Sequence, residues 1–301
     1  MLDTFNWNDI RYFLAVARTG RLQTAAKKLN VNHTTVARRL AALDAAINAQ
    51  LFESDSAGYH LTAIGEMLLP LAQKMEDTAQ HSRELISSSN NSLLGHFRIG
   101  APDGFGNTFL TSLLTEFLTA HKDITIELTP VPISLNLSRR EVDLAITIDP
   151  STRANIHNTK ITDYDLLIYT SKEYISRSGF SIDDDANLHT HTFSEYITDL
   201  LFSDQLSFNK TIDTQIESRF RSSTVLAQLE FIVGGGGIGV LPYYLAKKHP
   251  NLIPVLTDKF KMTRTYWLLT PYDLRRLASV RAFERYLLLK AVECESEFTC
   301  E

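Results

Sequence analysis

A cluster of polar side chains between positions 32 and 39 has the composition of a nucleic-acid-binding surface. His33, Thr34 and Thr35 occupy the first turn of an expected helix, the part that can enter the major groove of DNA. Arg38 follows one turn later, and a guanidinium group binds guanine O6 and N7 or holds a phosphate. A solvated helix face is the alternative interpretation. The candidate DNA-contacting residues are Asn32, His33, Thr34, Thr35, Arg38 and Arg39.

Other patterns with catalytic or ligand-binding potential are weaker. The glycines of the 234–239 run have GxGxxG spacing, but a helix is expected before them and a strand after them, which favours a turn over a nucleotide site. His189 and His191 lack a third ligand, so we expect two exposed histidines and no metal site. The acids at 183–185 lack the glycine and glutamate of a calcium loop, which favours a solvated turn. No nucleophile stands in a recognisable elbow, so the sequence predicts neither an enzyme nor a cofactor.

Three helices must position the polar cluster. Apolar residues at helical spacing predict these helices over residues 7–18, 24–29 and 33–47, with Gly20 ending the first. The tight turn at 30–32 requires one residue near the left-handed region, where asparagine is the best substitute for glycine. We expect the Asn32 side chain to cap the third helix by accepting a backbone N–H. This is a helix-turn-helix pattern.

A short β-hairpin is expected next. Residues 51–52 and 60–62 have strand character and flank a glycine-containing turn at 54–59. Such a hairpin beside a helix-turn-helix is a wing, which normally contacts phosphate. Glu53 and Asp55 would repel phosphate, so we expect weak, strongly salt-dependent binding by this wing.

A long helix is expected from about residue 63 to 88, with Thr62 as its N-cap. Its apolar residues follow the alternating four-and-three spacing of a coiled-coil seam, which favours dimerisation. Packing of the helix on its own domain is the alternative. Pro70 removes one backbone donor and is expected to bend the helix. The seam residues that we expect in a dimer are Ile64, Leu68, Leu71 and Met75.

The remainder of the chain alternates between strand and helix patterns. Strands are expected at 96–100, 124–128 and 144–148, and later at 166–169, 239–242 and 266–269. Helices are expected at 108–120 and 223–231. This order indicates an α/β fold with a parallel sheet. The polar run at 87–92 marks the boundary before it.

Charge is distributed unevenly along the 301 residues. The net charge of the chain is −5, but residues 1–65 carry +2 and the remainder carries −7. The positive field therefore lies on the helical region, where DNA phosphates would bind.

No secretory signal, membrane-spanning run or disulfide framework is visible, so we expect a cytoplasmic protein.

The motifs of the whole chain resemble those of LysR-type transcription regulators. RYFLAVARTG, AAKKLNVNHTTVARRLAALDAAI and the segment LFE to LTAIGE are similar to the DNA-binding domain of that family, in a subgroup that carries HTTVARRL. SLNLSRREVDLAI, SSTVLAQLEFIVGGGGIGVLP and TPYDLRRLASVRAF resemble the effector domain. The helix start NHTT and the acidic wing depart from the family pattern, so no base preference can be transferred.

This resemblance implies a sequence-specific regulator of transcription that a small-molecule effector modulates. The implied fold is α/β overall, with an N-terminal all-α winged helix-turn-helix, a linker helix, and a C-terminal two-lobed domain similar to periplasmic binding proteins. The implied domains are 1–62, 63–92 and 93–301, with lobe I at about 93–163 and 268–290 and lobe II at about 164–267. The implied partners are double-stranded DNA, an unidentified effector, and further copies of the chain in a homodimer or homotetramer.

Matching the family's cleft-lining loops to this sequence gives the candidate effector-binding residues Pro102, Asp103, Phe105, Ser134, Thr147, Asp149, Ser194 and Tyr196. Asp103 and Asp149 favour a basic or neutral effector, or they are structural caps. Two alternative functions remain open. One is a two-lobed solute-binding or enzymatic protein with an accessory helical domain, and the other is a regulator whose ligand site is degenerate.

Overall fold

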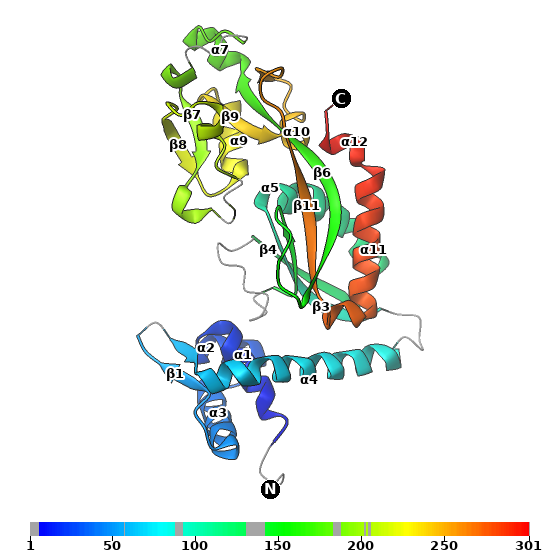
Figure 1. The fold of residues 1–301 in the computed structure, drawn as a ribbon. Coiled ribbons are helices and arrows are strands. Elements are labelled where there is room, and N and C mark those ends of the chain that lie inside the picture. Colours follow the sequence, from blue (N-terminus) through cyan, green and yellow to red (C-terminus); the bar gives the residue numbers. More distant parts are fainter. Residues whose placement is uncertain are drawn as a thin grey trace. The chain divides into compact units, whose positions relative to one another are not determined.

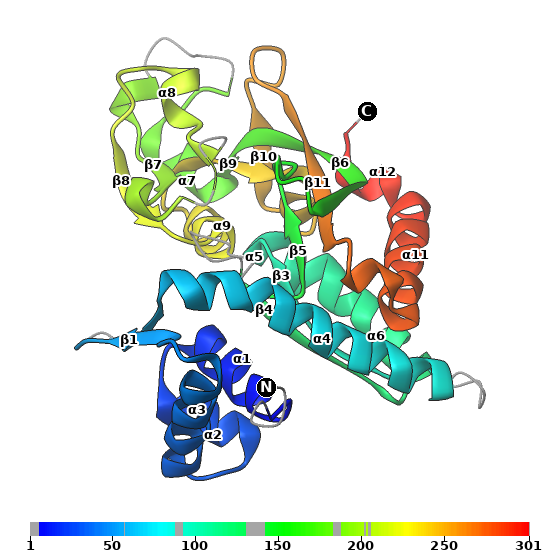
Figure 2. The same cartoon turned by 60° about the horizontal axis from the view of Figure 1, so that its bottom comes forward.

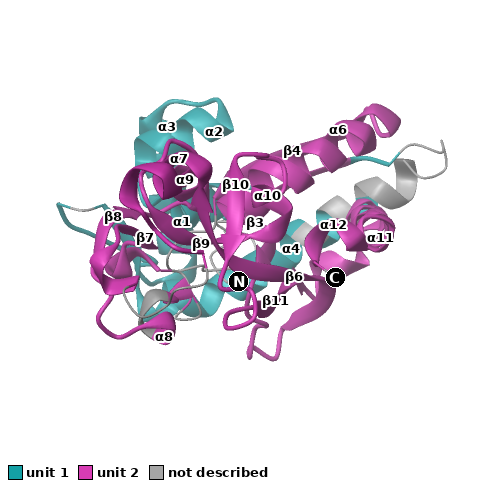
Figure 3. Ribbon diagram, turned by 90° about the horizontal axis from the view of Figure 1, so that it is seen from above, with its two compact units in different colours: residues 1–94, 136–141 teal, residues 95–135, 142–301 magenta. Residues whose placement is uncertain are grey.

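A computed structural model describes residues 6–56, 58–87, 93–130, 142–182, 188–201, 203 and 206–300. The chain divides into two compact units, the first within residues 1–94 and the second within 95–135 and 142–301 (Figure 3). No helix within the described ranges has the length and apolar composition needed to cross a membrane.

Unit 1 consists of helices around a small core and a two-stranded hairpin (Figure 2). Its elements are α1 (Asp9–Thr19), α2 (Leu22–Leu29), α3 (His33–Ile47), β1 (Phe52–Ser54), β2 (Tyr59–Leu61) and α4 (Ala63–Ser87). The core combines the apolar stripes of the helices, including Phe13 and Leu14 of α1, Val36 of α3 and Leu69 of α4. The predicted helices, hairpin and long helix are therefore confirmed.

The turns of unit 1 explain how the helices cross. Asn30 follows α2 in the left-handed region, with φ of 54°, so an asparagine meets the steric requirement of the turn as predicted. The predicted cap at Asn32 is wrong, because its side chain makes no cap hydrogen bond. Its backbone carbonyl instead accepts from the Thr35 N–H at 2.9 Å. The hydroxyl of Thr62 does accept from the Gly65 N–H at 3.1 Å, which confirms the predicted N-cap of α4.

Unit 2 contains a nine-stranded mixed sheet with helices packed on it (Figure 1). Its strands are β3 (Gly95–Ala101), β4 (Ile124–Pro130), β5 (Leu144–Thr147), β6 (Ile156–Ser171), β7 (Phe193–Tyr196), β8 (Ser218–Ser222), β9 (Ile238–Pro242), β10 (Leu252–Val255) and β11 (Met262–Pro271). Its helices are α5 (Asp103–Phe105), α6 (Thr111–Ala120), α7 (Lys172–Ser178), α8 (Asn209–Ile212), α9 (Val225–Val233), α10 (Tyr243–Ala246), α11 (Ala278–Glu293) and α12 (Glu295–Phe298).

The strand order is β4-β3-β5-β11-β6-β9-β7-β8, with β10 also paired to β6. Strands β3, β4 and β5 form a first parallel group, and β7, β8 and β9 form a second. The two long strands β6 and β11 connect these groups and pair antiparallel with each other. The expected parallel pairing is therefore present within each group, and the sheet as a whole is mixed. The expected lobe boundaries, near residues 163 and 268, fall within these continuous strands.

The four-glycine run ends a helix and begins a strand, as predicted. Helix α9 ends at Val233, Gly235 adopts φ of 76°, and β9 begins at Ile238. Among the histidines nearby, His191 is half-buried rather than exposed, because its ring packs on Phe180 with centroids 4.9 Å apart and its Nδ1 lies 3.2 Å from the hydroxyl of Tyr174. Residues 183–185, expected to form a solvated turn, lie outside the described residues.

Candidate functional sites

Helix α3 presents a polar surface because its opposite face is anchored in the core of unit 1. Val36, Leu40 and Leu43 are buried at helical spacing and fix the rotation of the helix about its axis. On the other side, Asn32, His33, Thr34 and Arg38 are exposed, while Thr35 is half-buried. The first turn of α3 also offers unpaired backbone N–H groups and the positive end of the helix dipole. This surface can bind a polyanion and can present side chains to base edges.

Arg39 differs from Arg38 in what its guanidinium group contacts. Its Nη1 lies 3.2 Å from Oδ1 of Asp9, and its Cζ lies 5.9 Å from the centroid of the Tyr12 ring. The Asp9 side chain is only 4% exposed, so this ion pair compensates a buried carboxylate. The arginine therefore holds α3 to α1. Of the two arginines, Arg38 is the one whose side chain is left exposed.

The β1–β2 hairpin is held against the turn between α1 and α2. The Tyr59 N–H donates to the Gly20 carbonyl at 2.8 Å. Gly58 has φ of 141°, and a Cβ at this position would lie 2.4 Å from the Gly20 oxygen, so only glycine fits there. Glu53 and Asp55 are exposed on the hairpin, as the sequence suggested. Asp55 also has a local role, because it accepts from the Gly58 N–H at 3.1 Å within the turn.

Sequence reasoning did not select the exposed cations in α2 and at its N-cap. Three cations are exposed beside the helix-turn-helix: Arg21, Lys27 and Lys28. Arg21 lies close to the point where Gly58 contacts Gly20. The excess of positive charge in residues 1–65 was the available signal. These side chains can contact the DNA backbone, which positions a protein without reading sequence.

The four residues expected in the α4 seam fall into two classes. Leu68 and Met75 pack against the core of their own unit. Ile64 and Leu71 are 45% and 61% exposed, and Met67, which the seam spacing omitted, is 74% exposed. An ion pair between Arg18 and Glu76 also holds α4 to α1. The exposed apolar residues of α4 therefore form a different stripe from the predicted one.

A groove of about 1130 Å³ lies beside this part of α4, within unit 1. Leu71, Lys74 and Met75 line it from α4, and Trp7 and Arg11 line it from the start of the chain and α1. The Trp7 side chain is 64% exposed. Exposed apolar surface of this extent in a groove is typical of a protein-binding site.

In unit 2, three of the expected effector-binding residues come together. Pro102, Asp103 and Tyr196 line a small cavity between the first and second strand groups, together with Tyr164 and Tyr266 of the two long strands. The cavity measures about 20 Å³, which is room for roughly one water molecule. The cleft is therefore closed in this conformation.

A cluster of buried phenols combines three that line the cavity, Tyr164, Tyr196 and Tyr266, with Tyr244, which contacts them. The hydroxyls of Tyr244 and Tyr266 are 2.9 Å apart, and the rings of Tyr164 and Tyr266 are stacked with centroids 4.2 Å apart. Burial raises the pKa of Tyr196, Tyr244 and Tyr266 above the usual tyrosine range, so these groups are neutral hydrogen-bonding side chains. Tyr164 and Tyr266 were missed in the sequence because they stand within long strands rather than in loops.

Two carboxylates join the strand groups across the cleft. The Leu226 N–H, at the start of α9, donates to Oδ2 of Asp103 at 3.1 Å. The Ser203 hydroxyl donates to Oδ2 of Asp149. Burial raises the pKa of Asp103, and backbone N–H groups at the start of α9 partly oppose this rise. Both acids thus make structural contacts in this closed conformation.

Of the expected effector-binding residues that the structure describes, four do not line the cavity: Phe105, Thr147, Asp149 and Ser194. Phe105 is fully buried in an aromatic cluster, 4.4 Å from Tyr266 and 5.3 Å from Phe109 between centroids. Ser194 is buried against β9, where a Cβ on Gly239 would meet its hydroxyl. The Thr147 hydroxyl donates to the Asp149 carbonyl at 2.6 Å. Ser134 lies outside the described residues. In the described ranges no group of His, Cys, Asp and Glu side chains could hold a metal ion.

Comparison with protein families agrees with this division of the chain. Residues 7–66 match the bacterial regulatory helix-turn-helix protein, lysR family, and residues 90–291 match the LysR substrate binding domain. The chain belongs to the LysR family of transcriptional regulators. The first region covers α1 to β2 and the first residues of α4, and the second begins before β3 and ends within α11.

Individual LysR-family relatives are distant in sequence. The Mau operon transcriptional activator of Paracoccus denitrificans is 30% identical over 150 residues, 50% of this chain and 53% of that protein. DgdR of Burkholderia cepacia is 30% identical over 149 residues, 48% of this chain and 50% of that protein. The chain thus spans about half the length of these two curated relatives. The glycine cleavage system transcriptional activator homolog of Haemophilus influenzae is 22% identical over 297 residues, 96% of each chain.

A solved LysR-type structure shows the same fold over the whole chain. Full-length OxyR from Pseudomonas aeruginosa, in a form with one cysteine replaced by aspartate, superposes with a TM-score of 0.72 at 18% identity. The match covers 99% of this chain and 98% of that one. At this identity the likeness concerns the fold alone.

Proposed function

We propose that this LysR-family protein regulates transcription by binding duplex DNA through α3 and by responding to a small molecule in the cleft of unit 2. The observation that carries the proposal is the N-terminal half of α3, where Asn32, His33, Thr34 and Arg38 are exposed on a helix fixed by its buried face. Base contacts from Arg38, with Thr35 at the edge of the surface, would read sequence, and Arg21 and Lys27 would contact phosphate. Since Arg39 pairs with Asp9, its proposed part is to orient α3.

We further propose that the protein works as a homodimer or homotetramer in the cytoplasm, and that it belongs to a subgroup carrying HTTVARRL. The exposed stripe of Ile64, Met67 and Leu71, with the groove beside it, supports pairing through α4. A dimer presents two α3 helices to a near-palindromic site with half-sites about 10 bp apart.

The effector proposal rests on the cleft between the strand groups. An effector would have to displace the contact of Asp103 with the Leu226 N–H, or the contact of Asp149 with Ser203, since the closed cleft has room for little more than a water molecule. The carboxyl and phenol groups facing the cavity favour a small basic or neutral molecule. A regulator with a degenerate ligand site is the second candidate, and the volume of about 20 Å³ is the observation in its favour.

Two measurements test these proposals. Genomic footprinting of the purified protein at stated salt is expected to yield sites with two half-sites about one helical turn apart. Thermal-shift screening against amines, neutral molecules and carboxylates then tests the cleft. Stabilisation by amines or neutral molecules supports the effector proposal, and stabilisation by carboxylates alone contradicts its chemistry. No stabilisation by any class, confirmed by calorimetry, would favour the degenerate site.

A further inference from the structure

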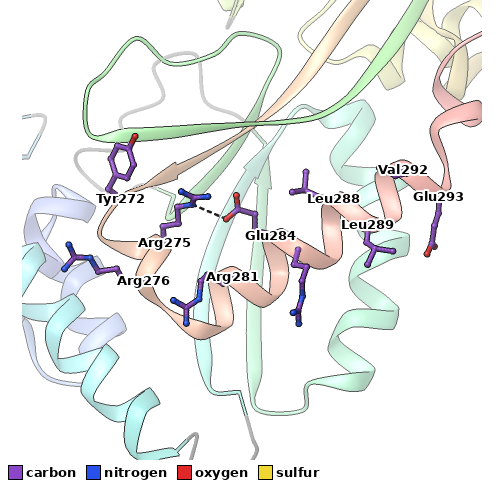
Figure 4. A pocket seen from close by; sticks show the side chains of 10 residues that line it. Tyr272, Arg275, Arg276, Arg281, Glu284, Leu288, Leu289, Val292 and Glu293 are labelled. Atoms are coloured by element: carbon purple, nitrogen blue, oxygen red, sulfur yellow. Dashed lines mark ion pairs between the residues drawn. The ribbon is translucent and has the colours of Figure 1, made fainter.

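Helix α11 has an exposed stripe that differs in character along its length (Figure 4). One face is buried in unit 2 through Val280, Phe283, Leu287 and Ala291, and the Phe283 ring packs against Phe97 and Phe117. The exposed residues recur at helical spacing on the opposite face of α11 and form the stripe. Its exposed members are Arg281, Arg285, Leu289 and Val292, with half-buried Leu288 among them and exposed Arg276 in the turn before the helix.

The N-terminal end of the stripe carries uncompensated positive charge. Arg276, Arg281 and Arg285 are exposed and form no ion pair with any residue that the structure describes. Arg275, by contrast, lies 3.7 Å from Glu284, which also accepts from the Thr159 hydroxyl at 2.8 Å. The first turn of α11 contains no acid. Arg276 and Arg281 lie near the N-terminus of α11, where cations are unfavourable, and Arg281 and Arg285 are like charges four residues apart, so this arrangement costs stability unless an external anion binds.

The C-terminal end of the stripe is apolar. Leu289 and Val292 are 55% and 71% exposed, and Leu288 is half-buried between them and the arginines. The stripe lines a groove of about 880 Å³, which Tyr272, 51% exposed, borders at the arginine end. Large aliphatic side chains that are exposed on the outer face of a helix do not gain the free energy of burial. A partner that covers them would supply it.

The length and composition of the groove distinguish between classes of occupant. From Arg281 to Glu293 the helix extends about 18 Å, so a lone phosphate would occupy only the arginine end. A nucleic-acid backbone would meet Leu289 and Val292 and the exposed acid Glu293, none of which favours phosphate. An amphipathic helix with acids at one end and leucines at the other matches both halves of the groove.

We propose that this groove docks an acidic amphipathic helix of a partner protein. The carboxylates of that helix pair with Arg276, Arg281 and Arg285, and its apolar residues cover Leu289 and Val292. The surface lies entirely within unit 2 and uses no residue of the proposed DNA-binding or effector sites. It gives the protein a protein-binding function in addition to those two.

The test uses the full chain and a synthetic peptide of about 16 residues. The peptide has two glutamates and three leucines at the spacing of the stripe, and a fluorophore reports binding by anisotropy. The wild type is expected to bind it, and Arg281→Glu/Arg285→Glu to bind about tenfold more weakly or worse. A peptide with lysines in place of the glutamates should show the reverse preference. Leu289→Ser/Val292→Ser is expected to weaken binding of both peptides.

Controls separate docking from folding and from net charge. Lys122→Glu/Arg219→Glu makes the same charge change at exposed sites of unit 2 and should bind like the wild type. The Arg281→Glu/Arg285→Glu variant should melt close to the wild-type temperature, since both side chains are exposed and neither forms an ion pair with a described residue. Equal peptide binding by the reversed and wild-type proteins would overturn the proposal. So would binding of inorganic phosphate or random duplex DNA at these arginines without the peptide, or a change of oligomeric state in the reversed variant by sedimentation.

Discussion

Replacing Arg38 or Arg39 by alanine is expected to separate base recognition from folding, although the two residues are adjacent. Arg38 is exposed on α3, whereas Arg39 pairs with the buried Asp9. Arg38→Ala removes one bidentate donor, which is worth about 1–3 kcal/mol of discrimination for each half-site. This corresponds to a loss of about 5- to 150-fold in specificity for each half-site, with little change in melting temperature.

Arg39→Ala leaves the Asp9 carboxylate buried without its cation. Loss of one partner from a fully buried pair costs about 3–5 kcal/mol, but the Arg39 side chain is 33% exposed, so water screens this pair. We expect about 1–2 kcal/mol, which lowers the melting temperature of a domain of this size by roughly 4–16 °C. Folded Arg39→Ala protein, assayed below its transition, should keep most of its base preference.

The assay is competition between the footprinted operator and random duplex at one fixed salt concentration, followed by fluorescence anisotropy. The ratio of the two dissociation constants measures base discrimination, and a thermal melt of the same sample measures stability. Unchanged discrimination in Arg38→Ala would refute the assignment of α3 as the reading helix. Unchanged stability in Arg39→Ala would refute the structural role of the pair with Asp9.

Four further results are expected. Gly58→Ala should destabilise unit 1 by about 1–3 kcal/mol in urea unfolding, because its Cβ would lie 2.4 Å from the Gly20 oxygen, and wild-type stability would contradict this contact. Glu53→Arg should tighten nonspecific DNA binding and steepen its salt dependence by about one unit of slope, and an unchanged affinity would count against a wing close to phosphate. Leu71→Glu should dissociate the oligomer in sedimentation without lowering the melting temperature, since Leu71 is 61% exposed, and an intact oligomer would exclude this stripe. Burial raises the pKa of Asp103, so the Asp103 carboxyl keeps its proton to higher pH in the folded chain than in the unfolded chain. The protonated carboxyl therefore stabilises the fold at low pH, and this stabilisation is lost as pH rises from about 3.8 through the raised pKa. The melting temperature of the wild type minus that of Asp103→Asn should therefore fall with rising pH, and a constant difference would argue against it.

The local architecture of unit 1 was determined by the sequence itself. Apolar spacing located α1, α3 and α4, because a periodic stripe reports which face of a helix must be buried. Asn30 marked the left-handed turn, and Thr62 the N-cap of α4, because each residue acts on the backbone within a few positions of itself. These requirements hold whatever the rest of the chain does.

Only the tertiary structure decided which of the selected side chains are available. The pairing of Arg39 with Asp9 spans 30 positions, and the contact of Asp103 with the Leu226 N–H spans 123, so no local pattern contains either. The long strands β6 and β11 made the sheet mixed and brought Tyr164 and Tyr266 to the cleft, while burying Phe105 beside them. Periodicity gives the buried face of an element, but register and crossing determine what that face meets. For this reason the sequence indicated where the sites lie, and the fold determined which residues form them.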